Sequence, residues 1–239
     1  MGVSNNRLSK IVWLFGFAVI AATNSGCAFG SKTLDVAYDA AKFEKGKLET
    51  SPPLAVVIGE FSDKRPETDK IGYKRNKYFR TAKVYSAKPP LEILRTALQE
   101  EIARHGHQAV APGDLKFSGT LDTFWFEYDY DGMVTLDVKG EIRMTLRVAD
   151  SSGAVLYERP YRGWHQELEP LGEEFKWVEV MNTCLSSVIE QIRTDGRLAE
   201  VLAAEAAKKG SGGAAPPGKR RVRKPRASPA AAEQQAPTP

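Results

Sequence analysis

The sequence predicts an α+β fold, with a mostly antiparallel sheet, two main helices packed on one face of it, and a disordered basic tail at the C-terminus. Three observations lead to this prediction. Apolar residues alternate with mostly polar ones from 134 to 148, as they do in a half-buried strand. They recur at helical spacing in 89–105 and in 173–192. Residues 208–239 show no apolar periodicity.

The first predicted strand covers residues 54–58 (LAVVI), which are rich in β-branched side chains and follow Pro52 and Pro53. A polar loop comes next, and two short strands are expected at 71–74 and 81–85. These three strands precede the first amphipathic helix in the sequence.

The two main helices are predicted from apolar stripes at a spacing of three and four residues. In 89–105 the helix opens on two prolines, which suit a first turn because their missing N–H groups would have no partner there. Its stripe is Leu91, Leu94, Leu98 and Ile102, and the stripe of 173–192 is Trp177, Val180, Met181, Cys184, Val188 and Ile192. We interpret Cys184 as a small buried apolar residue, and a short helix at 198–207 as the end of the domain.

The long strands lie between these helices. In 115–130 the alternation shifts phase between Leu121 and Phe124, which predicts a bulge. Asp131-Gly132 signals a hairpin turn into the strongly alternating strand that follows. A further strand at 154–161 contains Pro160, which places it at an edge of the sheet or at a bulge.

The N-terminus has the three-part layout of an export signal. Residues 1–10 are polar and basic, residues 11–22 (IVWLFGFAVIAA) are apolar, and small or polar residues follow up to Cys27. The apolar run is shorter than the about 20 residues that a spanning helix needs. We therefore expect residues 1–26 to be a lipoprotein signal peptide.

Ser25, Gly26 and Cys27 resemble a lipobox, the motif of small residues before the acylated cysteine of bacterial lipoproteins, although Asn24 stands where the motif usually has an aliphatic residue. We expect acyl groups on Cys27 to hold the protein on a membrane. Ordinary signal cleavage and an uncleaved anchor are the alternatives. By resemblance to lipoprotein sorting, Ala28 favours the outer membrane, with the domain facing the periplasm.

The mature chain is predicted to have three parts: the acylated cysteine and a linker at 27–52, the α+β periplasmic domain at 53–207, and the tail at 208–239. The tail cannot offset its ordering entropy by apolar burial and is expected to be disordered. Its basic cluster is a candidate contact for anionic lipid or an envelope polymer, with a partner-free solubilising extension as the alternative. The cluster consists of Lys219, Arg220, Arg221, Arg223, Lys224 and Arg226.

Several short motifs together resemble the YajG family of bacterial lipoproteins, from the lipobox to about residue 195. They are a strand leading to Asp63-x-Arg65 and Ile71-Gly72, the helix after Pro89-Pro90 that ends in Arg104-His105-Gly106, and a strand pair that begins near 117–121 (FSGTL). The resemblance implies an envelope lipoprotein without an established activity, and it names no ligand. The basic tail is not part of the family pattern.

The sequence contains no nucleophile-elbow, P-loop, dinucleotide-binding or zinc-protease motif. His105 and His107 stand where a helix ends, and no cluster of Cys or carboxylates at ligand spacing accompanies them. We expect them to be a solvent-exposed pair at the helix end rather than metal ligands. The chain is therefore predicted to have no enzymatic activity, no metal and no cofactor.

One loop combines cations with aromatics on an otherwise mildly acidic domain. Its candidate anion- or ligand-binding residues are Lys74, Arg75, Lys77, Tyr78 and Arg80. Such a loop suits anionic head groups or sugars, because arginine offers planar, bidentate donors. A solvated hairpin loop is the alternative. Nucleic acid is excluded as a partner by the export signal.

We expect a membrane-anchored envelope lipoprotein that acts as a structural or interaction module and docks an envelope protein partner. One face of the aromatic row at 124–130 is a candidate docking surface, although burial under a helix explains the row equally well. The alternative function is an auxiliary subunit of an envelope transport system that binds lipid or glycolipid through the basic loop.

Overall fold

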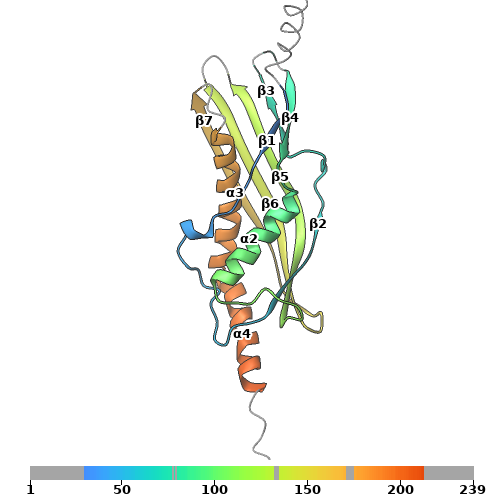
Figure 1. The fold of residues 1–239 in the computed structure, drawn as a ribbon, viewed down its shortest axis with the longest axis vertical. Helices are drawn as coiled ribbons and strands as arrows, with labels where there is room; N and C mark the ends of the chain where they lie inside the picture. The colour runs from blue at the N-terminus through green and yellow to red at the C-terminus, as the bar shows by residue number, and fades with distance from the viewer. Residues whose placement is uncertain (1–29, 77, 79, 132–134, 171–174, 213–239) are drawn as a thin grey trace, which may run out of the picture.

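The computed structural model describes residues 30–76, 78, 80–131, 135–170 and 175–212. It shows an elongated seven-stranded sheet with helices on one of its faces (Figure 1). The strands are β1 Lys32–Leu34, β2 Val56–Asp63, β3 Gly72–Arg75, β4 Thr81–Ser86, β5 Leu115–Asp131, β6 Thr135–Asp150 and β7 Val155–Pro170. The helices are η1 Ala40–Lys42, α2 Pro90–Arg104, α3 Phe175–Thr194 and α4 Gly196–Gly212.

The α+β class is confirmed, and the sheet is mixed but mostly antiparallel, as predicted, because its two longest pairings, β5–β6 and β6–β7, are antiparallel. Its order is β1-β4-β3-β5-β6-β7, and β2 pairs with the first half of β5 while β3 pairs with the second half. Both of these pairs are parallel, as is β1 with β4, whereas β3–β4, β5–β6 and β6–β7 are antiparallel. The pairs of β2 and β3 with β5 are parallel because the chain returns to β5 through α2, and a helix is the usual crossover between parallel strands.

The long strands follow the sequence pattern closely. The register between β5 and β6 shifts between Leu121 and Thr123, which confirms the predicted bulge. Pro160 lies on β7, which among the described residues pairs only with β6 and is therefore an edge strand, as predicted. At an edge, the N–H that proline lacks would face away from the ladder without cost.

Helices α2 and α3 lie on the same face of the sheet, as expected, and α4 continues past the end of the strands (Figure 1). The buried stripe of α2 includes Leu94, Leu98 and Ile102. Helix α4 is longer than the predicted 198–207, so residues 208–212 belong to a helix and not to a disordered tail. Its last turns are held by an ion pair between Lys209 Nζ and Asp114 Oδ2 at 2.8 Å.

Helix α3 approaches the sheet very closely at two glycines. A Cβ on Gly163 of β7 would lie 1.9 Å from the carbonyl oxygen of Cys184, and one on Gly140 of β6 would lie 2.9 Å from Cys184 Sγ. Cys184 is fully buried, which confirms its interpretation as a small core residue. Burial raises the pKa of its thiol to about 12, so it remains a protonated thiol at neutral pH.

The segment expected to be a linker, residues 27–52, is part of the fold from residue 30 onward. It contributes β1 and η1, and three of its side chains, Leu34, Val36 and Leu48, are buried in the core. Leu34 and Val36 alternate with exposed residues, but this stretch is short and Leu48 lies far from it in the sequence, so the sequence pattern did not reveal their burial. The domain therefore begins at about residue 30 and not at residue 53.

We predict that Gly163→Ala lowers the free energy of unfolding by about 1–3 kcal/mol or more, because the added methyl must displace the α3 backbone. Urea unfolding followed by circular dichroism would measure this loss. Gly196→Ala is the matched control, since nothing lies within 4 Å of a Cβ there. An equal loss in both variants would contradict the close packing of α3 against β7.

Candidate functional site

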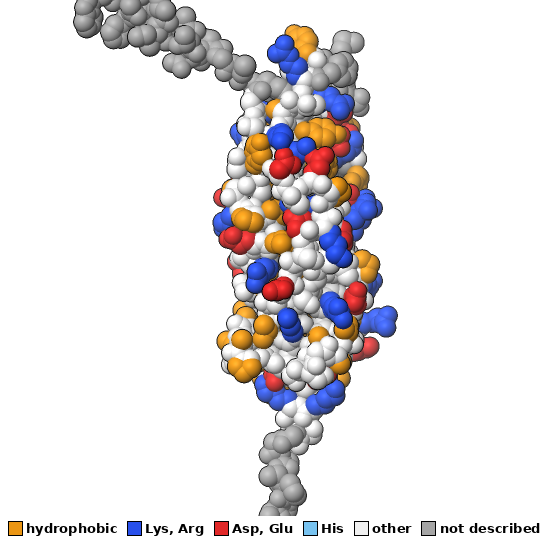
Figure 2. Space-filling model, turned by 90° about the vertical axis from the view of Figure 1, so that its right-hand side faces the viewer, with side chains coloured by type: hydrophobic (Ala, Val, Ile, Leu, Met, Phe, Trp, Pro, Cys, Tyr) orange, Lys and Arg blue, Asp and Glu red, His pale blue; other side chains and the backbone are white. Residues whose placement is uncertain are grey.

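The two ends of the domain carry different features. One end, here the β3–β4 end, contains the turn between these strands and the start of the described chain. The other, the α4 end, contains the segment 105–114 between α2 and β5, the β6–β7 turn and α4 (Figure 1). Figure 2 shows cationic and apolar side chains next to each other at the β3–β4 end. The sequence-predicted loop lies there, whereas Cys27 and the basic cluster of the tail lie outside the described residues.

The predicted loop does not form one cationic cluster. Lys74 is only 7% exposed, and its ammonium lies 5.6 Å from the ring centroid of Trp177 on α3. Arg75 points to the opposite face of the sheet, where its guanidinium lies 3.4 Å from Asp129 Oδ2. Neighbouring residues of a strand point to opposite faces, so the two cations cannot bind one ligand together.

The described residues at the tip of the loop are hydrogen-bonded to Asn76. The side-chain oxygen Oδ1 of Asn76 accepts hydrogen bonds from the backbone N–H groups of Tyr78 at 3.0 Å and Arg80 at 3.1 Å. Tyr78 is 71% exposed and Arg80 is exposed as well, while Lys77 lies outside the described residues. Of the described candidate residues, Tyr78 and Arg80 are those that the turn presents at the surface.

The aromatic row divides between the two faces of β5. Phe126 and Tyr128 pack against Trp177 of α3, with ring centroids 5.4 and 4.4 Å apart, so this part of the row is core. Trp125 lies on the helix-free face, here called the open face, and meets Tyr73 edge-on at 5.6 Å. Helix α3 thus covers the aromatic side chains on one face of β5, and those on the other face are not covered by it.

The open face carries charged side chains around exposed apolar ones. Glu141 Oε1 accepts hydrogen bonds from Nε of Arg143 and Nε of Arg162, each at 2.6 Å. Trp164 stands directly opposite Glu141 in the register of β6 and β7 and is 51% exposed. Leu168, four residues further along the edge strand, is 64% exposed. Exposed apolar side chains beside an edge strand are typical of docking surfaces.

A shallow pocket lies on this face beside the bulge of β5. It has a volume of about 270 Å³ and is lined by Arg65, Pro66, Glu67, Asp122, Thr123, Phe124 and Trp125. This volume is slightly smaller than the roughly 300–1,000 Å³ of most ligand pockets. Arg65 is committed to the fold, because its Nε and Nη2 donate to Asp63 and its Nη1 donates to the carbonyl of Lys70 at 3.0 Å. The Asp63-x-Arg65 motif therefore stabilises the loop that runs from Asp63 to Lys70.

The expectation of an exposed histidine pair is wrong: His105 is 1% exposed and His107 is 3% exposed. His105 Nδ1 donates to the carbonyl of Glu101 at 2.9 Å, and Nε2 accepts from the N–H of Gly46 at 2.9 Å. His107 Nε2 lies 2.6 Å from the carbonyl of Leu48. The end of α2 is buried because residues 35–54, here called the strap, cross over it.

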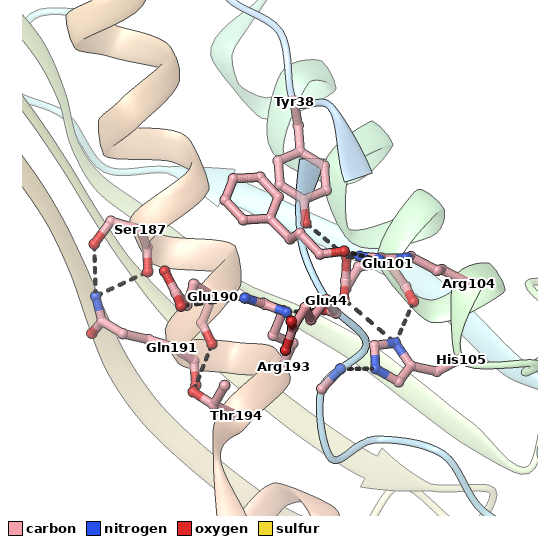
Figure 3. A network of polar contacts seen from close by, with 12 residues as sticks. Tyr38, Glu44, Glu101, Arg104, His105, Ser187, Glu190, Gln191, Arg193 and Thr194 are labelled. Carbon is pink, nitrogen blue, oxygen red and sulfur yellow. Dashed lines mark hydrogen bonds and ion pairs between the residues drawn. The ribbon is translucent and has the colours of Figure 1, made fainter. Parts of the chain in front are cut away.

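Side chains of both main helices hold the strap in place (Figure 3). The hydroxyl of Tyr38 donates to Glu101 Oε2 at 2.7 Å. The guanidinium of Arg104 donates to the carbonyl of Phe43, and that of Arg193 on α3 donates to the carbonyl of Glu44. The two arginines therefore fix backbone carbonyls of the strap, and Glu101 holds the side chain of Tyr38. Among the described residues, no group of three or more His, Cys, Asp or Glu side chains could hold a metal ion.

Asp195 joins α3, α4 and β7 in a second buried polar group. Its Oδ2 accepts from the hydroxyls of Tyr157 at 2.6 Å and Tyr161 at 3.1 Å and from Nη1 of Arg159 at 2.5 Å. Its Oδ1 caps α4 by accepting from the N–H of Leu198 at 3.2 Å. Burial opposes ionisation, but these donors outweigh it and lower the pKa of Asp195 to about 2.

Comparisons with known proteins identify the class to which this chain belongs. A family model described as uncharacterized lipoprotein matches residues 57–203, which is more than half of the chain. The chain therefore belongs to this family of lipoproteins, and such membership indicates a membrane-anchored protein of the cell envelope. No curated protein matches the chain. In the part of the chain that the structure describes, none of the helices has the length and apolarity needed to cross a membrane.

Three solved structures are similar to this chain at low sequence identity. Protein XCC0632 from Xanthomonas campestris is 16% identical, with a TM-score of 0.43 over 76% of this chain and 98% of that one. Lipoprotein GNA1162 from Neisseria meningitidis is 12% identical, with a TM-score of 0.27 over 59% and 98%. The PelC dodecamer from Paraburkholderia phytofirmans is 15% identical, with a TM-score of 0.32 over 61% and 93%. We draw no functional conclusion from likenesses at this level.

We predict that the strap loosens on mild acidification. Burial lowers the pKa of His107 below its usual 6.5, so the unfolded chain binds a proton more readily than the folded one. Stability from His107 is complete above about pH 6.5 and is lost as the pH falls through the lower folded-state pKa. The unfolding free energy of the parent should fall between pH 7.5 and pH 5, and that of His107→Gln should fall less.

Urea unfolding at both pH values would measure this difference. His107→Gln should also cost about 1–3 kcal/mol at pH 7.5, because buried backbone groups of the strap lose their partner. His165→Gln on β7 is the matched change outside the strap and should cost less. The role of His107 is refuted if its variant loses as much stability on acidification as the parent does.

We predict that two substitutions of Asp195 lower the free energy of unfolding by different amounts. Asp195→Ala removes a helix cap and the acceptor of two tyrosine hydroxyls and should cost about 2–4 kcal/mol. Asp195→Asn retains a capping oxygen and should cost less. Since the pKa is lowered from 3.8 to about 2, the charge contributes stability above pH 3.8 that is lost as the pH falls through 2. In thermal unfolding, the melting temperature of the parent should therefore approach that of Asp195→Asn over this pH range. A constant difference between the two melting temperatures would contradict the stabilising role of the Asp195 charge.

Proposed function

We propose that this chain is a YajG-like lipoprotein of the outer membrane that serves as a non-enzymatic interaction module for an envelope protein. Its signal peptide, residues 1–26, is removed, acyl groups on Cys27 anchor it, and its domain faces the periplasm. Membership of the lipoprotein family supports the anchor, and the lipobox-like Ser25-Gly26-Cys27 supports its position. The buried ionisable groups described above support a module without catalysis, because their partners belong to the fold.

The observation that carries the interaction role is the pair Trp164 and Leu168 on the open face of β7. Both side chains are more than half exposed, and neither contributes to the core. The two side chains lie on one face of the strand, about 13 Å apart. Exposed aromatic and aliphatic side chains among charged residues are the usual composition of an interaction hot spot and its rim. Among the described residues β7 is an edge strand, and a partner strand can pair with its outer backbone groups other than the carbonyl of Arg162, which accepts from Gln191 Nε2 at 2.6 Å.

The alternative function, an auxiliary lipid- or glycolipid-binding subunit of an envelope transport system, has one observation in its favour. Tyr78 and Arg80 are exposed together at the β3–β4 end. The cations that were to form its binding loop do not converge, however, since Lys74 and Arg75 point to opposite faces. We therefore favour the interaction module.

We predict that Trp164→Glu combined with Leu168→Glu abolishes partner binding. Affinity capture of the tagged lipoprotein from detergent-solubilised envelopes should return a stoichiometric protein partner with the parent, and at least about tenfold less with the double variant, as for loss of a hot spot. Both side chains are largely exposed, so the unfolding free energy should change by less than about 0.5 kcal/mol.

Val110→Glu is the matched control, because Val110 is an exposed apolar residue, 49% accessible, at the α4 end. It should retain the partner. Equal recovery with the double variant and the control would refute the open face as the docking surface. Recovery of the chain itself in place of another protein would show that the face joins two copies of it.

A further inference from the structure

We infer that the β3–β4 turn is a second membrane contact, in which Tyr78 and Arg80 lie on an anionic lipid surface next to the acylated Cys27. The domain then stands with its α4 end directed away from that membrane. The inference rests on the proposed anchor and adds to it an orientation and a lipid class. It is carried by three observations: the length of the tether, the position of the turn and the chemistry of the turn.

The tether is too short to let the domain stand away from the membrane. Only Ala28 and Phe29 separate Cys27 from Gly30, where the described chain begins, and β1 pairs with β4 from Lys32 onward. Three residues of fully extended chain span at most about 10–11 Å. Gly30 is therefore held within that distance of the lipid headgroups, and Lys32, where β1 begins, within about 17–18 Å of them.

The turn projects as far toward the membrane as the start of the chain does. Lys32 pairs with Val84, and β4 runs in the same direction as β1 from Thr81. The turn therefore lies at least three residues beyond the level of Lys32, which is about 10 Å, while Gly30 lies at most two residues, about 7 Å, beyond it. Figure 1 shows the β3–β4 turn at the same end as β1. A membrane at Cys27 therefore lies next to the turn.

The chemistry of the turn suits an anionic lipid surface. Tyr78 is 71% exposed on a turn whose backbone is fixed by Asn76, so its ring is presented outside the core. Tyrosine is enriched at the membrane interface, where its ring meets the acyl region and its hydroxyl stays hydrated. Arg80 adds a guanidinium that can donate two parallel hydrogen bonds to a lipid phosphate.

The other charges near the turn are largely paired within the fold. Arg75 contacts Asp129, and Lys83 of β4 donates to Asp69 at 2.6 Å. Two acidic side chains of this region are thereby neutralised, which lowers the repulsion that they would exert on anionic headgroups. A single set of acyl groups and one cationic–aromatic contact together give the two signals that fix orientation as well as attachment.

The mature, acylated full-length chain reconstituted in vesicles tests the inference. Tyr78→Cys carries an environment-sensitive fluorophore, and Val110→Cys carries the same fluorophore at the α4 end; buried Cys184 stays unlabelled, which the parent verifies. The vesicles contain phosphatidylcholine with phosphatidylglycerol and a lipid with a nitroxide quencher at the headgroup. We expect the label at position 78 to be quenched at least about twofold and the label at position 110 to remain unquenched.

Charge variants identify the lipid class. Arg80→Glu should reduce quenching at position 78, and so should replacing phosphatidylglycerol with phosphatidylcholine. Arg197→Glu, the same charge change at the α4 end, should have no effect. Chains that stay on the vesicles after a high-salt wash but show equal quenching at both positions, or none at position 78, would overturn the inference alone. Chains that wash off would overturn the proposed anchor together with it.

Discussion

The close contact between α3 and the sheet at Gly140 and Gly163 determines where the rest of the structure lies. Because the backbone of Cys184 nearly touches β7, the helix has one depth and one position along the strands. From that position Trp177 at its start covers the aromatic side chains of β5, and Arg193 near its end reaches the strap. Small residues on the helix and on the strands allow this short distance between them, and the dense packing around these residues leaves no room for a different distance.

The strap shows how a segment with little regular structure can still be buried. Backbone groups outside helices and sheets need hydrogen-bond partners when they lose contact with water. Here the partners are side chains: histidines just after the end of α2 for Gly46 and Leu48, and arginines of α2 and α3 for Phe43 and Glu44. Buried titratable groups therefore replace a secondary-structure ladder in this part of the domain.

Features set by local periodicity could be predicted from the sequence, and features set by distant segments could not. The stripe of α2, the bulge after Leu121 and the edge position of Pro160 follow from spacing and residue type within one element. Burial of the strap depends on scattered side chains such as Val36 and Leu48, whose spacing resembles that of an ordinary loop. His107 seemed exposed because the helix end, taken without the strap, is a surface.

The candidate loop shows a limit of a different kind. Its cations were grouped because they are adjacent in the sequence, yet the alternation of a strand already requires Lys74 and Arg75 to point in opposite directions. Applying that period to the end of the predicted strand 71–74 would have separated them. Tyr78 and Arg80 could be identified as surface residues, but their position beside β1 follows from the parallel pairing of β1 and β4, which no local pattern contains.

The pairing of β1 with β4 also decides how the domain would respond to mechanical load. A pull on the N-terminus acts along the axis of β1, so the hydrogen bonds from Lys32 to Leu34 are sheared together rather than opened one after another. Behind them, the strap spreads the same force over α2 and α3 through Tyr38, Arg104 and Arg193. A domain that is pulled through its own first strand in this way resists extraction by drag or by movement of a bound partner.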